Sequence, residues 1–152
     1  MHWQKQLLLV TGLSLGLFTA AVPGQAHEIK FGSLVVVHPW TRGAPDGEVD
    51  GFMKIANKGT EDDRLTGVTA DISSKVILCD VKREGEALKM VVLPDGIPIP
   101  AGKTVELSSK SFHIMFLNVK SPPVPDTEFG GTLTFENAGT LAVDFEVEEP
   151  VK

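Results

Sequence analysis

The sequence predicts an all-β domain, folded as an antiparallel sandwich or a Greek-key barrel. Its 15 glycines and 10 prolines are distributed between short runs of strand-forming residues, where they favour turns. No stretch of the chain after the first few tens of residues shows a convincing helical period. About eight or nine short strands can therefore cover one core without helices.

The expected strands are rich in β-branched and apolar residues, and turn sequences containing glycine or proline separate them. In chain order they are expected at residues 33–38, 51–56, 63–69, 74–81, 87–92, 104–108, 112–119, 131–136 and 140–146. The three prolines within 122–125 predict a surface loop, because proline cannot donate to a central ladder.

Residues 1–26 are interpreted as a cleavable export signal. A short segment carrying Lys5 precedes an apolar run at 7–22, and the small residues Gly24 and Ala26 follow it. The run is shorter than the roughly 20 apolar residues of a membrane span. Cleavage after Ala26 would leave residues 27–152 as a single periplasmic domain without a retained membrane anchor. No cysteine stands at the end of the signal, so a bacterial lipid anchor would have no attachment point there.

Composition and motifs exclude several classes of function. The formal net charge is −6, and no basic run is interleaved with aromatic residues, so nucleic acid is not expected as a partner. The chain has no Gly-x-Ser-x-Gly, His-Glu-x-x-His or glycine-rich phosphate loop, so no enzyme activity is predicted. The only cysteine is Cys79, which excludes an internal disulfide.

The expected strand 112–119 places two metal-binding side chain types on one face. Side chains alternate along a strand, so Ile114 and Phe116 face the core while His113 and Met115 share the opposite face. An imidazole beside a thioether forms half of a soft-metal site. By itself the pair is also typical of a packed histidine next to a gap-filling methionine.

Two further soft donors precede this pair. Cys79 and Met90 lie in consecutive expected strands, separated by ten residues that contain a turn, so a hairpin can bring them together. Thiolate, thioether and imidazole are all ligands that a soft metal accepts. Because sulfur is scarce in this chain, the succession of Cys79-x10-Met90 and His113-x-Met115 is more informative than any single one of these residues.

The chain resembles the PCu(A)C-type periplasmic copper chaperones over about residues 32–147. The similar segments are His38-Pro39-Trp40-Thr41-Arg42, Gly51-Phe52-Met53-Lys54-Ile55, Glu61-Asp62-Asp63-Arg64-Leu65, Leu93-Pro94, Ile99-Pro100-Ala101-Gly102 and Leu133-Thr134-Phe135-Glu136-Asn137-Ala138-Gly139. The family carries a His-x10-Met pair followed by His-x-Met. Met90, His113 and Met115 match this pattern, whereas Cys79 stands where the family has its first histidine.

The resemblance implies a cupredoxin-like β fold and one Cu(I) per chain, held by Cys79, Met90, His113 and Met115. It also implies a monomeric metallochaperone that delivers copper to an acceptor protein, namely cytochrome c oxidase subunit II with its binuclear copper centre, directly or through a Sco-type protein. A thiolate in place of the neutral imidazole would change the charge of the copper-loaded site from +1 to 0 and favour retention of the metal.

Other interpretations remain open from the sequence. Cys79 can be a buried thiol that binds no metal, which would leave a three-ligand site of Met90, His113 and Met115. Alternatively, the cysteine change can have abolished copper binding, in a domain that only contacts partner proteins. A blue-copper electron carrier would need a second imidazole from His38 or His27. His27, as the mature N-terminus, would offer an α-amine and an imidazole to Cu(II).

Overall fold

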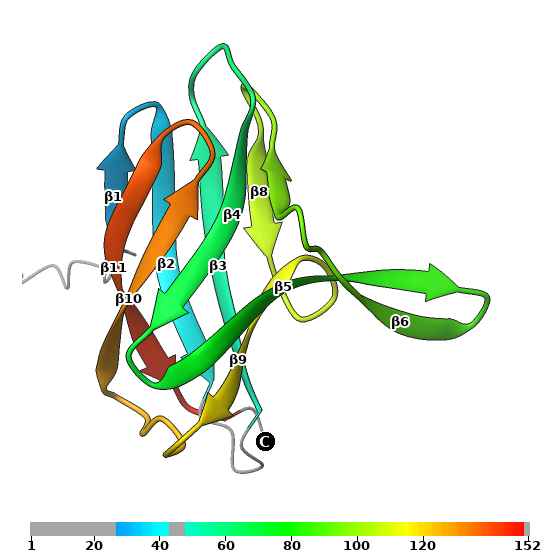
Figure 1. Ribbon diagram of the computed structural model, residues 1–152, viewed down its shortest axis with the longest axis vertical. Coiled ribbons are helices and arrows are strands. Elements are labelled where there is room, and N and C mark those ends of the chain that lie inside the picture. Colours follow the sequence, from blue (N-terminus) through cyan, green and yellow to red (C-terminus); the bar gives the residue numbers. More distant parts are fainter. Residues whose placement is uncertain (1–26, 43–47, 151–152) are drawn as a thin grey trace, which may run out of the picture.

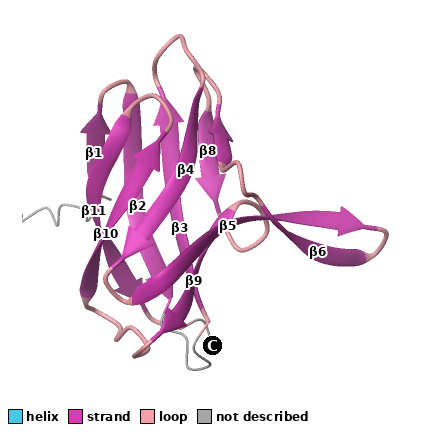
Figure 2. Cartoon of the chain, viewed as in Figure 1, coloured by secondary structure: helices cyan, strands magenta, loops and turns pink. Residues whose placement is uncertain are grey.

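The computed structural model describes residues 27–42 and 48–150, in which every regular element is a strand (Figure 2). The eleven strands are β1 (Glu28–Phe31), β2 (Leu34–Arg42), β3 (Val49–Asn57), β4 (Asp63–Ala70), β5 (Ser73–Glu84), β6 (Ala87–Val92), β7 (Ile97–Ile99), β8 (Thr104–Leu107), β9 (His113–Val119), β10 (Glu128–Phe135) and β11 (Gly139–Glu148). The predicted export signal lies outside the described residues. No described segment forms a helix able to cross a membrane.

Seven of the strands form a closed barrel. The order β2-β11-β10-β4-β5-β9-β3 returns to its start because β3 also pairs with β2. Of the other strands, β1 pairs with β2, β6 with β5, β7 with β4 and β8 with β3. Closure leaves the barrel strands without open edges, which allows an all-β chain to cover its core without helices.

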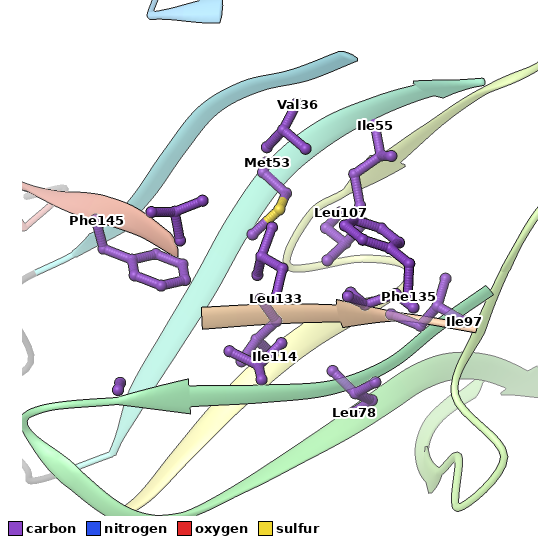
Figure 3. Packing of buried hydrophobic residues seen from close by; sticks show 14 of the residues in the cluster. Val36, Met53, Ile55, Leu78, Ile97, Leu107, Ile114, Leu133, Phe135 and Phe145 are labelled. Atoms are coloured by element: carbon purple, nitrogen blue, oxygen red, sulfur yellow. The ribbon is translucent and has the colours of Figure 1, made fainter. Parts of the chain in front are cut away.

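The core fills the inside of this barrel (Figure 3). Strands contribute alternate residues to it, as the pleat requires. Leu78, Ile114 and Leu133 are all buried and belong to one apolar cluster. Phe116 packs edge-on against Phe145, with ring centroids 5.3 Å apart.

The predicted all-β fold is confirmed, with two differences in detail. The short strands β1 and β7 were not expected; β7 contains Pro98, which is tolerated because β7 pairs only with β4. The barrel is not purely antiparallel, since β11 runs parallel to β2 where Glu146 pairs with Trp40. The predicted loop between 120 and 127 is free of strand.

One hairpin extends beyond the barrel. The second half of β5 and the whole of β6 project from its side (Figure 1). Their register runs from Cys79 opposite Val92 to Glu84 opposite Ala87. Cys79 therefore lies at the base of this hairpin, where β5 leaves the barrel wall.

Candidate metal centre

The pairing of β5 with β9 brings Cys79 and His113 together. Their Cα positions are partners in the antiparallel ladder, and so are those of the preceding β5 residue, Leu78, and the following β9 residue, Ile114. Leu78 and Ile114 point into the core (Figure 3), so Cys79 and His113 point to the outer face of the barrel wall. Directly opposed side chains of an antiparallel pair have Cβ atoms about 4.5–5.5 Å apart. A thiol and an imidazole are thus neighbours.

Both methionines lie on this same outer face. Met115 is two residues after His113 in β9 and pairs with Ile77 of β5. Met90 pairs with Val81, two residues after Cys79, and is therefore a diagonal neighbour of Cys79 across the β5–β6 ladder. Diagonal neighbours lie about 7–8 Å apart, within reach of a long, flexible side chain. The register thus places all four predicted donors on one face of three adjacent strands.

The four donors differ sharply in exposure. Cys79 is 0% exposed, His113 4% and Met115 8%, whereas Met90 is 52% exposed. Three donors are therefore withdrawn from water, and the fourth lies on the projecting hairpin. Such a set has one donor that is open to solvent while the others remain covered.

The His113 ring is held in one orientation. Its Nδ1 lies 2.9 Å from the carbonyl oxygen of Ser111. A carbonyl only accepts hydrogen bonds, so Nδ1 is the donor in this bond, and Nε2 is the nitrogen left for a metal ion. Metal-binding histidines are commonly oriented by such a bond from their second nitrogen.

The Cys79 thiol is protonated in this environment. Burial raises its pKa above the ordinary value for a thiol, and the negative charge of Asp50 raises it further. The same burial effect raises the pKa of Asp50, while the nearby His113 opposes that shift. A metal ion that binds Cys79 must therefore displace a proton.

Sequence reasoning did not identify Asp50. It lies opposite Met115 in the pairing of β3 with β9, and therefore on the same outer face as the four donors. Its position follows from the register between strands that are far apart in the chain, and no local motif marks it. Within the ranges 27–42 and 48–150, no group of three His, Cys, Asp or Glu side chains is arranged to hold a metal ion. The candidate centre thus depends on its methionines.

The two other histidines among the described residues, His27 and His38, lie elsewhere on the barrel. His38 Nε2 is 2.9 Å from Glu148 Oε1, and His38 Nδ1 is 3.4 Å from Glu146 Oε2. His27 Nδ1 lies 3.8 Å from the other oxygen of Glu146. Both imidazoles therefore face carboxylates of β11, and the barrel order places β3 between β2 and β9. The structure does not bring them to Cys79.

A β barrel with soft sulfur and imidazole donors gathered on one face defines a domain of the copper-chaperone type. Residues 34–147 match the model of the family "Putative lipoprotein LpqE-like", and the chain belongs to this LpqE-like, PCuAC-type family. No curated protein matches the chain.

Solved structures agree with this family. The copper-bound PCuAC domain from PmoF2 is 25% identical, with a TM-score of 0.68 over 82% of this chain and 99% of that domain. The apo form of the PmoF2 domain is 26% identical, with a TM-score of 0.67 over 83% and 98% of the two chains. The Cu(I) form of DR1885 from Deinococcus radiodurans, at 21% identity, has the same fold, with a TM-score of 0.65 over 85% and 84%.

Proposed function

We propose that this protein binds one Cu(I) through Cys79, Met90, His113 and Met115 and transfers it to an acceptor protein in the periplasm. The observation that carries the proposal is the register of β5, β6 and β9, which gathers the four donors on one face. Two thioethers, a thiolate and an imidazole form a set that suits a soft monovalent ion. The acceptor we propose is the binuclear copper centre of cytochrome c oxidase subunit II, reached directly or through a Sco-type protein.

The unequal exposure of the donors supports transfer as well as storage. Copper would pass by exchange of one ligand at a time between donor and acceptor. Met90 is the candidate for the first ligand exchanged, since it is half exposed and an uncharged thioether is a weaker donor than a thiolate. Cys79 and His113, both buried, would hold the ion until the acceptor has supplied its own sulfur.

Two other functions that the sequence left open, a blue-copper electron carrier and a domain that has lost copper binding, predict different behaviour. A blue-copper carrier needs two imidazoles beside the cysteine, but His38 and His27 face glutamates of β11. A degenerate domain would bind no copper. Titration of the reduced protein with Cu(I) against a chromophoric chelator distinguishes them. We expect one tightly held Cu(I) and no intense blue colour on oxidation; no uptake would reject the proposal. Reducing conditions also prevent Cu(II) from occupying the His27 and His38 region.

Replacing Met90 with leucine is expected to speed the release of Cu(I) to a chelator by about tenfold while leaving the unfolding midpoint unchanged. Leucine keeps the apolar bulk but removes the thioether, and Met90 lies outside the core. Met53→Leu is the matched control, because Met53 is 2% exposed inside the barrel and lies off the donor face. Stopped-flow mixing with a Cu(I) chelator measures the release rate of both variants, and thermal unfolding measures their midpoints. Equal release rates for wild type and Met90→Leu would show that Met90 is not a ligand.

The affinity for Cu(I) should fall as the pH is lowered. The pKa of Cys79 is raised, so its thiol is protonated throughout the neutral range and the metal must displace that proton. Below the thiol pKa, each pH unit is expected to cost about one factor of ten in apparent affinity. Chelator competition at pH 6, 7 and 8 would measure the slope. A flat profile would indicate that no thiol proton is displaced.

A further inference from the structure

The projecting hairpin of β5 and β6 exposes an apolar face to solvent (Figure 1). Leu88 and Val92 stand two residues before and after Met90 in β6, so all three side chains lie on the same side of the hairpin. Leu88 is 64% exposed and Val92 53%, close to the value for Met90. Of the four exposed large apolar side chains in residues 27–42 and 48–150, three are therefore gathered here. We call Leu88, Met90 and Val92 the hairpin patch.

One positive charge lies on the same side as the hairpin patch. Arg83 is exposed and is paired with Leu88, and directly paired residues share a face. The opposite side of the hairpin is polar, and there Lys89 Nζ lies 3.7 Å from Glu84 Oε2. Among the carboxylates of residues 27–42 and 48–150, none forms an ion pair with Arg83. The patch thus joins aliphatic surface to an unpaired guanidinium, on a chain whose formal net charge is −6.

Transfer of copper through Met90 requires contact with this patch. A sulfur atom of an acceptor can reach an ion bound to Met90 only when the acceptor surface lies against the neighbours of Met90. The Cα atoms of Leu88 and Val92 are each about 7 Å from that of Met90 along the strand. Contact therefore removes both side chains from water, which favours association. A carboxylate on the acceptor would also pair with Arg83 and fix the orientation of the complex.

Two other occupants fit the patch less well. A stable interface between two copies buries roughly 800 Å² on each partner, and three partly exposed aliphatic side chains supply far less than that. A lipid surface would meet the end of the hairpin, where the turn Gly85–Glu86 follows Glu84. Two carboxylates at this end would be repelled by anionic phospholipid headgroups. The small apolar area is instead suited to a brief contact between two proteins.

We propose that the hairpin patch and Arg83 form the docking surface for the copper acceptor, a protein whose own copper site is surrounded by apolar side chains and carries a carboxylate that pairs with Arg83. The inference rests on the proposed function, because the patch surrounds the ligand that is exchanged first. It adds the surface that recognises the acceptor and the chemistry that the acceptor must present.

The test measures docking without copper and transfer with copper. The probes are the soluble copper-binding domains of the two proposed acceptors, cytochrome c oxidase subunit II and a Sco-type protein, both reduced and metal-free. Association of the metal-free proteins is followed by NMR shift titration, and transfer of Cu(I) by stopped-flow mixing. The docking variant combines Leu88→Ser with Val92→Thr and keeps Met90. The matched control is Val124→Ser, which changes a side chain of similar exposure, 62%, in the loop after β9.

We expect the docking variant to weaken association with the acceptor, and to slow transfer to it, by about tenfold or more. Release of Cu(I) to a small chelator needs no docking surface, so this rate should stay within about twofold of wild type. Val124→Ser should match wild type in both measurements. Thermal unfolding of each variant verifies that it folds.

The charge is tested by Arg83→Glu. This reversal should weaken association by about tenfold at low ionic strength, and less as salt is added, because the paired charges are exposed. Lys82→Glu is its control, since it makes the same charge change on the opposite side of the hairpin. Equal losses for the two variants would show that only the overall charge matters and would overturn the role of Arg83.

The outcomes separate this inference from the proposed function. A docking variant that associates and transfers like wild type would overturn the inference and leave copper transfer standing. Wild type that takes up no Cu(I) would reject the proposed function, whereas the metal-free titration would still decide whether the patch docks. Wild type that associates with neither acceptor would overturn the inference. So would self-association, or binding to phosphatidylglycerol vesicles, that the docking variant loses in place of acceptor binding.

Discussion

Replacing Cys79 with serine is expected to lower the affinity for Cu(I) by about a hundredfold or more. The change removes the only anionic donor and puts a hard hydroxyl in place of a soft thiolate. Serine is close to cysteine in size, so the buried position should tolerate it sterically. Chelator competition in the reduced state would measure the loss.

The matched variant is Cys79→His, which installs the residue of the family pattern at the same position. It should retain Cu(I) and lose most of the pH dependence above about pH 7, because imidazole has an ordinary pKa near 6.5. If Cys79→Ser binds Cu(I) as tightly as wild type, Cys79 is a buried structural thiol and the centre has three ligands.

Replacing Phe116 with alanine is expected to reduce the free energy of unfolding by about 3–5 kcal/mol. Phe116 is 0% exposed and its ring makes edge contacts with those of Phe129 and Phe145, with centroids 5.7 and 5.3 Å away. Gly51 leaves room for this ring, since a Cβ there would lie 2.8 Å from Phe116 Cε2. Urea unfolding followed by circular dichroism would measure the change.

The control for Phe116→Ala is Phe31→Ala, in the first strand, β1. Phe31 is only partly buried and its ring centroid is 6.4 Å from that of Phe135, so its loss should cost clearly less. Equal losses for the two variants would contradict a core centred inside the barrel. Because Phe116 follows Met115 in β9, the Phe116→Ala variant should also loosen the metal centre.

Local patterns were sufficient to predict most strands and the side of β9 that carries donors. The alternation of His113 and Met115 with Ile114 and Phe116 is a property of any half-buried strand, so it could be read without coordinates. β7 was missed because Pro98 argues against a strand and only its pairing with β4 explains the proline. The parallel pairing of β11 with β2 has no local signal, since it joins opposite ends of the chain.

The sequence by itself determined the class of fold, the scarcity of sulfur and the four residue types suited to Cu(I). The tertiary structure alone decided that Cys79 lies opposite His113 and that Met90 projects on a hairpin while the other donors are buried. It also decided that Asp50 faces them from β3. The reason is physical: residue types and alternation are local properties, whereas the distance between side chains on different strands depends on register, which is fixed only when the barrel closes around its core.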